Sequence, residues 1–337
     1  LTAGWLMAGC SAEDELGNNS SAQQLNMIPM VNDLQKSRAN DEDALHEKTL
    51  SKLDFKMFEP EFGKCCVNHQ SSSPAENQAE VLGKNNWKVD LNLQEDHSYN
   101  YYAVANAQAD LSKKTLEELQ AATQQDNDIW QPYPQAKDKK FLMSAKGQYI
   151  ISKDPIQDIP VELVRAAAKI KLNLSSSVNG YNMTSVNWKF LNYNTNTSVF
   201  AGQTATPNIM SNNADNMVDK IEANKCSVTT YSYSTTWTSQ EDAPKIAVKV
   251  VFESKDNKND TREKELTIPV RDPKGEKKLE RNYIYTVNAD IKRLKDDINI
   301  DYDEELGYLK WAITKWTTGE DTEVDADKAS YLVVYPT

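Results

Sequence analysis

From residue 49 onward, apolar and polar residues alternate along most of the chain. Leu53, Phe55 and Met57, for example, are separated by Asp54 and Lys56. Successive side chains of a strand point to opposite faces, so a period of two predicts half-buried β-strands. The same pattern predicts strands at residues 87–93, 99–105, 141–152, 169–174, 186–190, 228–233, 246–252, 266–270, 283–291 and 309–313.

One segment has a helical pattern instead. Residues 111–125 place Leu116, Leu119 and Ala122 on one face, and Ser112 stands where it can cap the first turn. The connections between the predicted strands are rich in Asn, Asp, Ser, Gly and Pro, as hairpin and Greek-key turns require. Strands at this spacing without intervening helices predict an all-β chain built from β-sandwiches with one or two short helices.

The length of 337 residues predicts two domains, and an apolar fraction of 39% is enough for two cores. The formal net charge is −12, with 38 basic and 50 acidic residues. Because phosphate binding needs a basic stripe, and none occurs, no nucleic-acid partner is expected. Four cysteines at this length do not form a disulfide framework.

The first ten residues, LTAGWLMAGC, form a short apolar run that ends in small residues and Cys10. The run is too short to span a bilayer as a helix, but it fits the end of a secretory signal peptide. Its ending resembles a bacterial lipobox, which implies that Cys10 is acylated and becomes the first residue of a lipoprotein. A chance apolar start is the alternative. Residues 11–45 are polar and are interpreted as a tether with little order.

Catalytic chemistry is not expected. The chain lacks GxSxG, HExxH and CxxC motifs and a glycine-rich phosphate loop, and it holds only three histidines, all before residue 166. Cys65, Cys66 and His69 could offer metal ligands, but a strand with buried thiols is the simpler interpretation. The acidic residues 296–305 lack the spacing of a calcium loop and are interpreted as solvated. We therefore predict no catalytic site, no metal and no cofactor. Trp311 and Trp316 could form a carbohydrate platform, with strand packing as the alternative.

Four stretches together resemble the Gram-negative fimbrillins, also called type V pilins. They are YYAVANAQADL at residues 101–111, FLMSAKGQ at 141–148, LVRAAAKIKLNL at 163–174 and KKLERNYIYTVNADI at 277–291. Each is weak alone, but they occur in the family's order and cover most of the chain with the lipobox. The resemblance implies two tandem Greek-key, transthyretin-like sandwiches, with an N-terminal domain at residues 46–165 and a C-terminal domain at 166–337. Tyr283 stands where the family usually has His.

The resemblance also implies a route of assembly. An Arg-specific protease would cut between Arg165 and Ala166, and removal of the strand before the cut would open a groove. The C-terminal strand of another subunit would fill that groove by β-augmentation. Candidate donor residues are Trp311 and Ile313 in one segment, or, in the last one, Tyr331, Val333 and Tyr335. The alternative is that these strands complete their own sandwich.

The function implied is a structural stalk subunit of a surface fimbria, made as an outer-membrane lipoprotein precursor and then part of an extracellular fibre. The implied partners are other copies, tip and anchor subunits, the protease and a host surface ligand. A fimbrial tip adhesin or a surface glycan-binding lipoprotein is the alternative, and a secreted hydrolase on a sandwich scaffold is a third.

Overall fold

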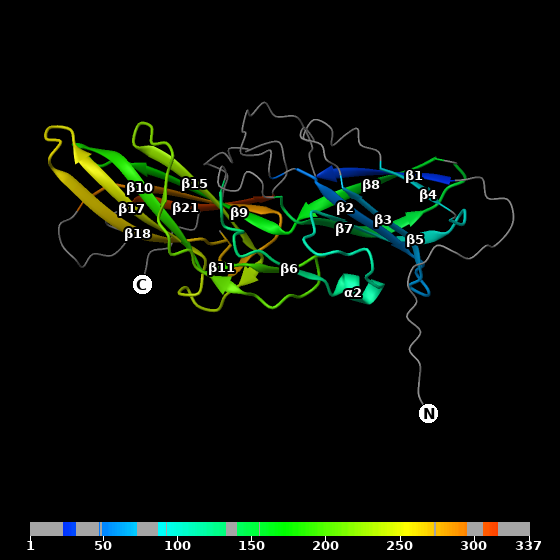
Figure 1. The fold of residues 1–337 in the computed structure, drawn as a ribbon. Helices are drawn as coiled ribbons and strands as arrows, with labels where there is room; N and C mark the ends of the chain where they lie inside the picture. Colours follow the sequence, from blue (N-terminus) through cyan, green and yellow to red (C-terminus); the bar gives the residue numbers. More distant parts are fainter. Residues whose placement is uncertain are drawn as a thin grey trace. The chain divides into compact units, whose positions relative to one another are not determined.

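The structure is a computed structural model that describes residues 23–31, 47, 49–72, 87–91, 93–132, 140–154, 156–272, 274–294 and 306–315. These residues form strands and one short helix (Figure 1), which confirms the all-β prediction. The chain divides into two compact units. The first comprises residues 1–124, 137–166 and 198–205, and the second comprises residues 125–136, 167–197 and 206–337.

The main division therefore lies after residue 166, one residue beyond the boundary expected at 165. Two short stretches cross it in sequence, since residues 125–136 belong to the second unit and residues 198–205 to the first. The order of residues in the sequence does not reveal the unit to which these two stretches belong, because that depends on which core each stretch packs against.

The first unit contains seven strands in one hydrogen-bonded order. Their bounds are β1 (Gln23–Val31), β2 (Lys52–Phe58), β3 (Cys65–Ser72), β4 (Trp87–Leu91), β5 (Ser98–Ala105), β7 (Met143–Ile150) and β8 (Ile156–Arg165). The order across the sheet is β3-β2-β5-β7-β8-β1-β4. Phe55, Met57, Ala103, Ile159 and Val161 are fully buried, so β2, β5 and β8 all contribute to the core of this unit.

Strand β1 corrects the interpretation of residues 11–45 as a tether. Residues 23–31 pair in parallel with β8 through eight registered pairs, and in antiparallel fashion with β4 through five. The polar composition of the surrounding residues concealed a short run with Leu25, Met27, Ile28, Met30 and Val31. A strand of nine residues can be specified by so few apolar positions once two neighbours satisfy its backbone.

The predicted helix is shorter than expected and begins later. Helix α2 (Leu116–Gln120) is capped by Thr115, whose hydroxyl accepts from the backbone N–H of Glu118 while the Glu118 carboxylate accepts from the N–H of Thr115. This reciprocal capping box outcompetes Ser112 as the start of the helix. In the part of the chain that the structure describes, no helix has the length and apolarity to cross a membrane. The short strand β6 (Thr123–Gln125) follows.

The second unit contains the remaining strands. Their bounds are β9 (Ala167–Ser176), β10 (Tyr181–Leu191), β11 (Tyr193–Asn194), β13 (Ile209–Met210), β14 (Asn216–Met217), β15 (Lys225–Tyr233), β16 (Thr235–Thr236), β17 (Lys245–Ser254), β18 (Thr261–Pro269), β19 (Lys278–Leu279), β20 (Tyr283–Ile291) and β21 (Leu306–Lys315). Strand β12 (Asn196–Ser198) spans the division between the units.

Two sheets make up most of the second unit. One has the order β14-β10-β17-β18, and the other has the order β13-β11-β15-β9-β20-β21. Burial alternates residue by residue along β17, where Ile246, Val248, Val250 and Phe252 are buried. This is the period of two seen in the sequence, so the predicted strands here are correct and their apolar faces form the core.

Candidate functional site

The predicted processing site lies at the junction between β8 and β9. Arg165 is fully buried, and its Nε donates to the backbone oxygen of Glu47 at 2.9 Å. Ala166 is 1% exposed, and its N–H donates to the carbonyl of Leu142 at 2.9 Å. A protease must bind several residues around the cut in an extended, accessible form. The bond after Arg165 therefore becomes available only after this junction opens.

The strand before Arg165 also has a different place from the one that the assembly model requires. Strand β8 pairs with β1 and, through its last two residues, with β7, all within the first unit. Strand β9 pairs with β15 and β20 in the second unit. Among the described residues β8 has no partner strand in the second unit. In the described sheets β8 therefore fills no position in the second unit, so a groove opened by its removal would lie in the first unit. The expected cut after Arg165 stays a prediction.

Strand β1 occupies the kind of position that was expected of the removable strand. It lies between β8 and β4 (Figure 1), so its loss would leave both neighbours without a partner on one side. In the sequence it is joined to β2 by residues 32–51, which contain Arg38. Arg38 and Arg165 are the only arginines before Arg262.

The first candidate donor segment is part of its own sheet. Strand β21 pairs with β20 along nine registered positions. Trp311 is 8% exposed, its indole N–H donates to the carbonyl of Pro269 at 2.9 Å, and the Arg271 guanidinium lies 5.2 Å from its ring centroid. Trp311 is thus tied to the end of β18, and Ile313 lies half-buried opposite Tyr285. Strand β21 therefore completes a sheet of its own unit, which was the alternative to donation.

The remaining candidates lie outside the described residues. These are Cys10 and the second donor set, Tyr331, Val333 and Tyr335. Acylation at Cys10 and donation by residues 331–335 stay predictions.

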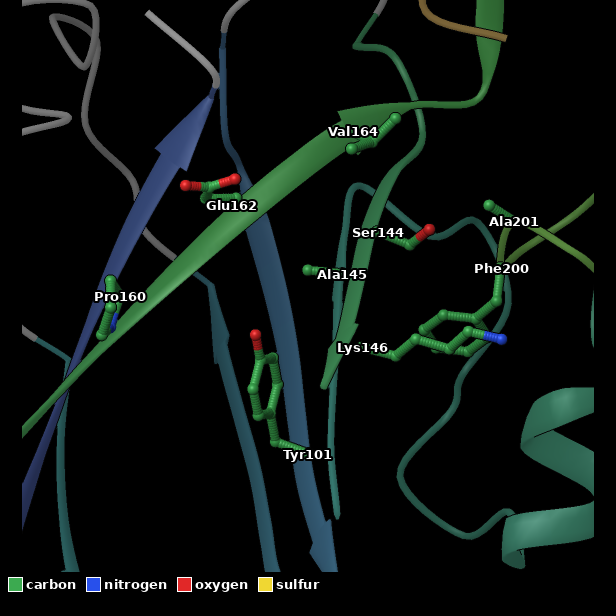
Figure 2. Close-up of a pocket in the computed structure, with 9 residues that line it drawn as sticks. All are labelled: Tyr101, Ser144, Ala145, Lys146, Pro160, Glu162, Val164, Phe200 and Ala201. Atoms are coloured by element: carbon green, nitrogen blue, oxygen red, sulfur yellow. The ribbon is translucent and has the colours of Figure 1, made fainter. Parts of the chain in front are cut away.

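A cleft separates β7 from most of β8 (Figure 2). The two strands pair only at Met143 with Arg165 and at Ser144 with Val164, and then diverge. The space between them has a volume of about 430 Å³. Its lining consists of Tyr101, Ser144, Ala145, Lys146, Pro160, Glu162, Val164, Phe200 and Ala201.

The Tyr101 side chain reaches this cleft because a glycine stands beside it. Tyr101 lies directly across from Gly147 in the β5–β7 ladder, and a Cβ on Gly147 would come within 2.8 Å of the tyrosine ring. The ring stacks on Phe55 with centroids 6.1 Å apart. Burial, and secondarily the Glu162 carboxylate, raises the pKa of the Tyr101 hydroxyl, so it stays protonated at neutral pH. The cleft thus presents an aromatic floor and a hydroxyl between two strands.

The vicinal cysteines lie on β3, so the strand is present, but its thiols are only partly buried. Cys65 and Cys66 are partly exposed, and the structure places no group of three or more possible metal ligands together within its described residues. Burial, followed by the nearby Glu59 carboxylate, raises the pKa of the Cys66 thiol to about 11. Burial also lowers the pKa of His69. These shifts favour neutral side chains.

Comparison with solved structures shows what this arrangement resembles. The fimbrilin FimA of Porphyromonas gingivalis W83 aligns with a TM-score of 0.58 at 13% identity, covering 89% of this chain and 99% of that one. The tip fimbrial protein Mfa3 of Porphyromonas gingivalis, with a C-terminal truncation, aligns with a TM-score of 0.55 at 15% identity, covering 87% and 99%. The chain has the fimbrilin fold.

No family model and no curated protein matches the chain. At such low identity the fimbrilin fold is carried by strand order and by burial pattern rather than by shared residues. A fimbrilin and a tip protein align almost equally well, so the fold does not separate a stalk role from a tip role.

Trp311 should hold β21 in place. We expect Trp311→Ala to lower the free energy of unfolding by about 3–5 kcal/mol, because it empties a buried aromatic site. Trp311→Phe keeps a ring and should lose about 1–2 kcal/mol with the indole hydrogen bond. Urea unfolding measures both, with Ile209→Ala as the control, since Ile209 is 48% exposed. An unchanged midpoint for Trp311→Ala would mean that β21 does not stabilise the second unit.

Cys66 should react slowly as a thiol. A pKa of about 11 leaves roughly two hundredfold less thiolate at pH 8 than a free cysteine with a pKa near 8.5. Alkylation by iodoacetamide, followed by peptide mass spectrometry, should therefore be slow at pH 8 and accelerate as the pH rises toward 11. The same reaction in denaturant is the control, and it should proceed at the free-thiol rate. Native alkylation at that rate would contradict the burial of the thiol.

Proposed function

We propose that this protein is a subunit of a bacterial surface fimbria, made as a lipid-anchored precursor through Cys10. In this proposal it assembles by exchange of a β-strand after proteolytic processing. The observation that carries the proposal is the place of β1, which is first in the chain yet internal in the strand order of its unit. A strand in that position can be separated from the rest by cutting one peptide bond.

The cut is proposed after Arg38 rather than after Arg165. Arg38 follows β1 and precedes β2 in the sequence, so cleavage there separates β1 while leaving β2 to β21 on one continuous chain. Cleavage after Arg165 would instead divide the first unit from most of the second. The burial of Arg165 and the exclusion of β8 from the second sheet support the same choice.

Loss of β1 supplies the drive for assembly. It leaves eight registered positions of β8 and five of β4 without their partner. Each backbone hydrogen bond contributes about 1 kcal/mol net, so the vacancy favours an incoming strand. An extended segment of another subunit would restore the order by β-augmentation.

The donor is proposed to be the segment after β21. Strand β21 is already paired along nine positions and held by Trp311, so donating it would expose the core of its own unit. Residues 316–337 remain, and Tyr331, Val333 and Tyr335 alternate there as a donated strand requires. The partners in this proposal are other fimbrial subunits and an Arg-specific protease.

Limited digestion with an Arg-specific protease tests the processing site. In an Arg293→Lys background, which removes the exposed arginine after β20, the folded chain should yield one dominant product that begins at Ala39, because the bond after Arg165 is buried. Arg38→Ala should abolish the cut, and Lys36→Ala is the matched control that should leave it unchanged. N-terminal sequencing and intact mass identify the product. A product that begins at Ala166 under native conditions would contradict the proposed cut after Arg38 and would identify Arg165 as the processing site.

Truncation tests the donor segment. A chain that ends at residue 315 should be cut normally but form no high-molecular-weight ladder on SDS gels, while its melting temperature stays within about 2 °C of the full chain. A chain that ends at residue 305 is the comparison, and it should melt lower because it lacks β21. Ladders from the chain that ends at 315 would exclude residues 316–337 as the donor. A cut chain that stays single at full length would favour a tip or glycan-binding role instead.

A further inference from the structure

One edge of β7 faces the cleft with its backbone groups open. Ile151, immediately after β7, donates to the carbonyl of His97 and accepts from the N–H of Asp96, so its backbone points toward β5. Backbone direction alternates along a strand, and the β5–β7 register has no shift. Lys146, Gln148 and Ile150 therefore direct their N–H and C=O groups toward β8. The described ladders give these three residues no partner on that side.

Proline explains why β8 does not cover this edge. The ladder between β7 and β8 includes Ser144 opposite Val164, and the N–H of Ala166 donates to Leu142. Continued in the same register, it would place Lys146 opposite Glu162 and Gln148 opposite Pro160, both at hydrogen-bonded positions. Pro160 has no N–H to offer the carbonyl of Gln148. Strand β8 keeps its pairing with β1 instead, where Pro160 lies opposite Ile28.

The side chains around the open edge are apolar, aromatic and basic. Ile150 is 64% exposed, which is high for a large apolar residue at the end of a sheet edge. Lys146 is exposed beside it, and the cleft next to the edge holds the Tyr101 ring and the buried Phe200. An unpaired edge of this kind is a template for another strand. The adjoining hollow can take one side chain of that strand, as pockets do in β-augmentation.

We propose that the edge of β7 and its cleft bind an extended segment of another polypeptide as an added strand. The segment places an apolar side chain in the cleft against Tyr101, and its neighbour, a carboxylate on the opposite face, across from Lys146, because opposite charges directly across a ladder attract. The site lies on the opposite side of β8 from β1. It is complete in the uncut chain, so it is independent of the strand exchange proposed above.

The test uses the uncut, full-length chain and a display library of random nonapeptides as the probe. Gln148→Pro removes one N–H that faces the cleft but none that faces β5, and an extended strand accepts proline at such a position. Gln148→Ala is the matched control, since both variants lose the side-chain hydrogen bond to Asn100. We expect selected peptides that alternate apolar and polar residues, at least a tenfold loss of affinity for Gln148→Pro, and less than a twofold loss for Gln148→Ala.

A second measurement keeps the test decisive if the proline variant does not fold. In the wild-type chain, a selected peptide should slow hydrogen exchange at the amides of Lys146, Gln148 and Ile150. Three results would overturn the proposal: a library that yields no binders, binders that retain full affinity for a folded Gln148→Pro chain, or protection confined to other residues. A simple sugar that binds the cleft equally in both variants would assign it to a small ligand and would also overturn it.

Discussion

Every strand has two edges whose N–H and C=O groups must find partners, and β8 is the strand on which this constraint acts most strongly. Eight of its positions pair with β1, two pair with β7, and the second ladder ends at Ser144 and Val164. The first unit is thus held together at β8 by a strand that comes from the start of the chain. Because β1 contributes so much of that pairing, the order of this sheet depends on β1.

The sequence analysis placed both the domain boundary and the protease cut at Arg165, and the structure sets different requirements for the two. The junction at Arg165 is a structural corner, where Ala166 bonds to Leu142 and the chain passes from the strand order of one unit to that of the other. Its arginine is buried, and its Nε donates to a backbone carbonyl, as large buried cations require. A processing site instead needs an accessible peptide bond. Its cleavage should release one strand and leave the other strands of the unit on one continuous chain.

The two open features of the first unit follow from β8 as well. In the described ladders it pairs with β1 on one side, and on the other it leaves the edge of β7 without a partner beyond Ser144. The second unit is more self-sufficient, since its two sheets carry a regular alternation of buried residues and β21 is fastened by Trp311 to the end of β18. Strand β21 is thus an integral part of its own sheet.

Much of the fold could be predicted from the sequence. Alternation in stretches such as 246–252 identified strands correctly, because it states which face of a strand is buried. It failed at β1, whose few apolar residues lie within a polar stretch, and at α2, where Thr115 and Glu118 form a cap that Ser112 does not. The cleft was not predictable, because it arises where β7 and β8 diverge after Ser144 and Val164, residues that become neighbours only in the sheet.

The sequence by itself determined the all-β class, most of the strand positions and the resemblance to fimbrillins. The tertiary structure alone decided which strands pair, that Arg165 is buried and that β1 belongs to the first unit. The physical reason is that side-chain periodicity specifies the two faces of a strand, whereas its two edges carry the same N–H and C=O groups in almost every residue. Partner choice therefore depends on long-range packing, which a local pattern does not encode.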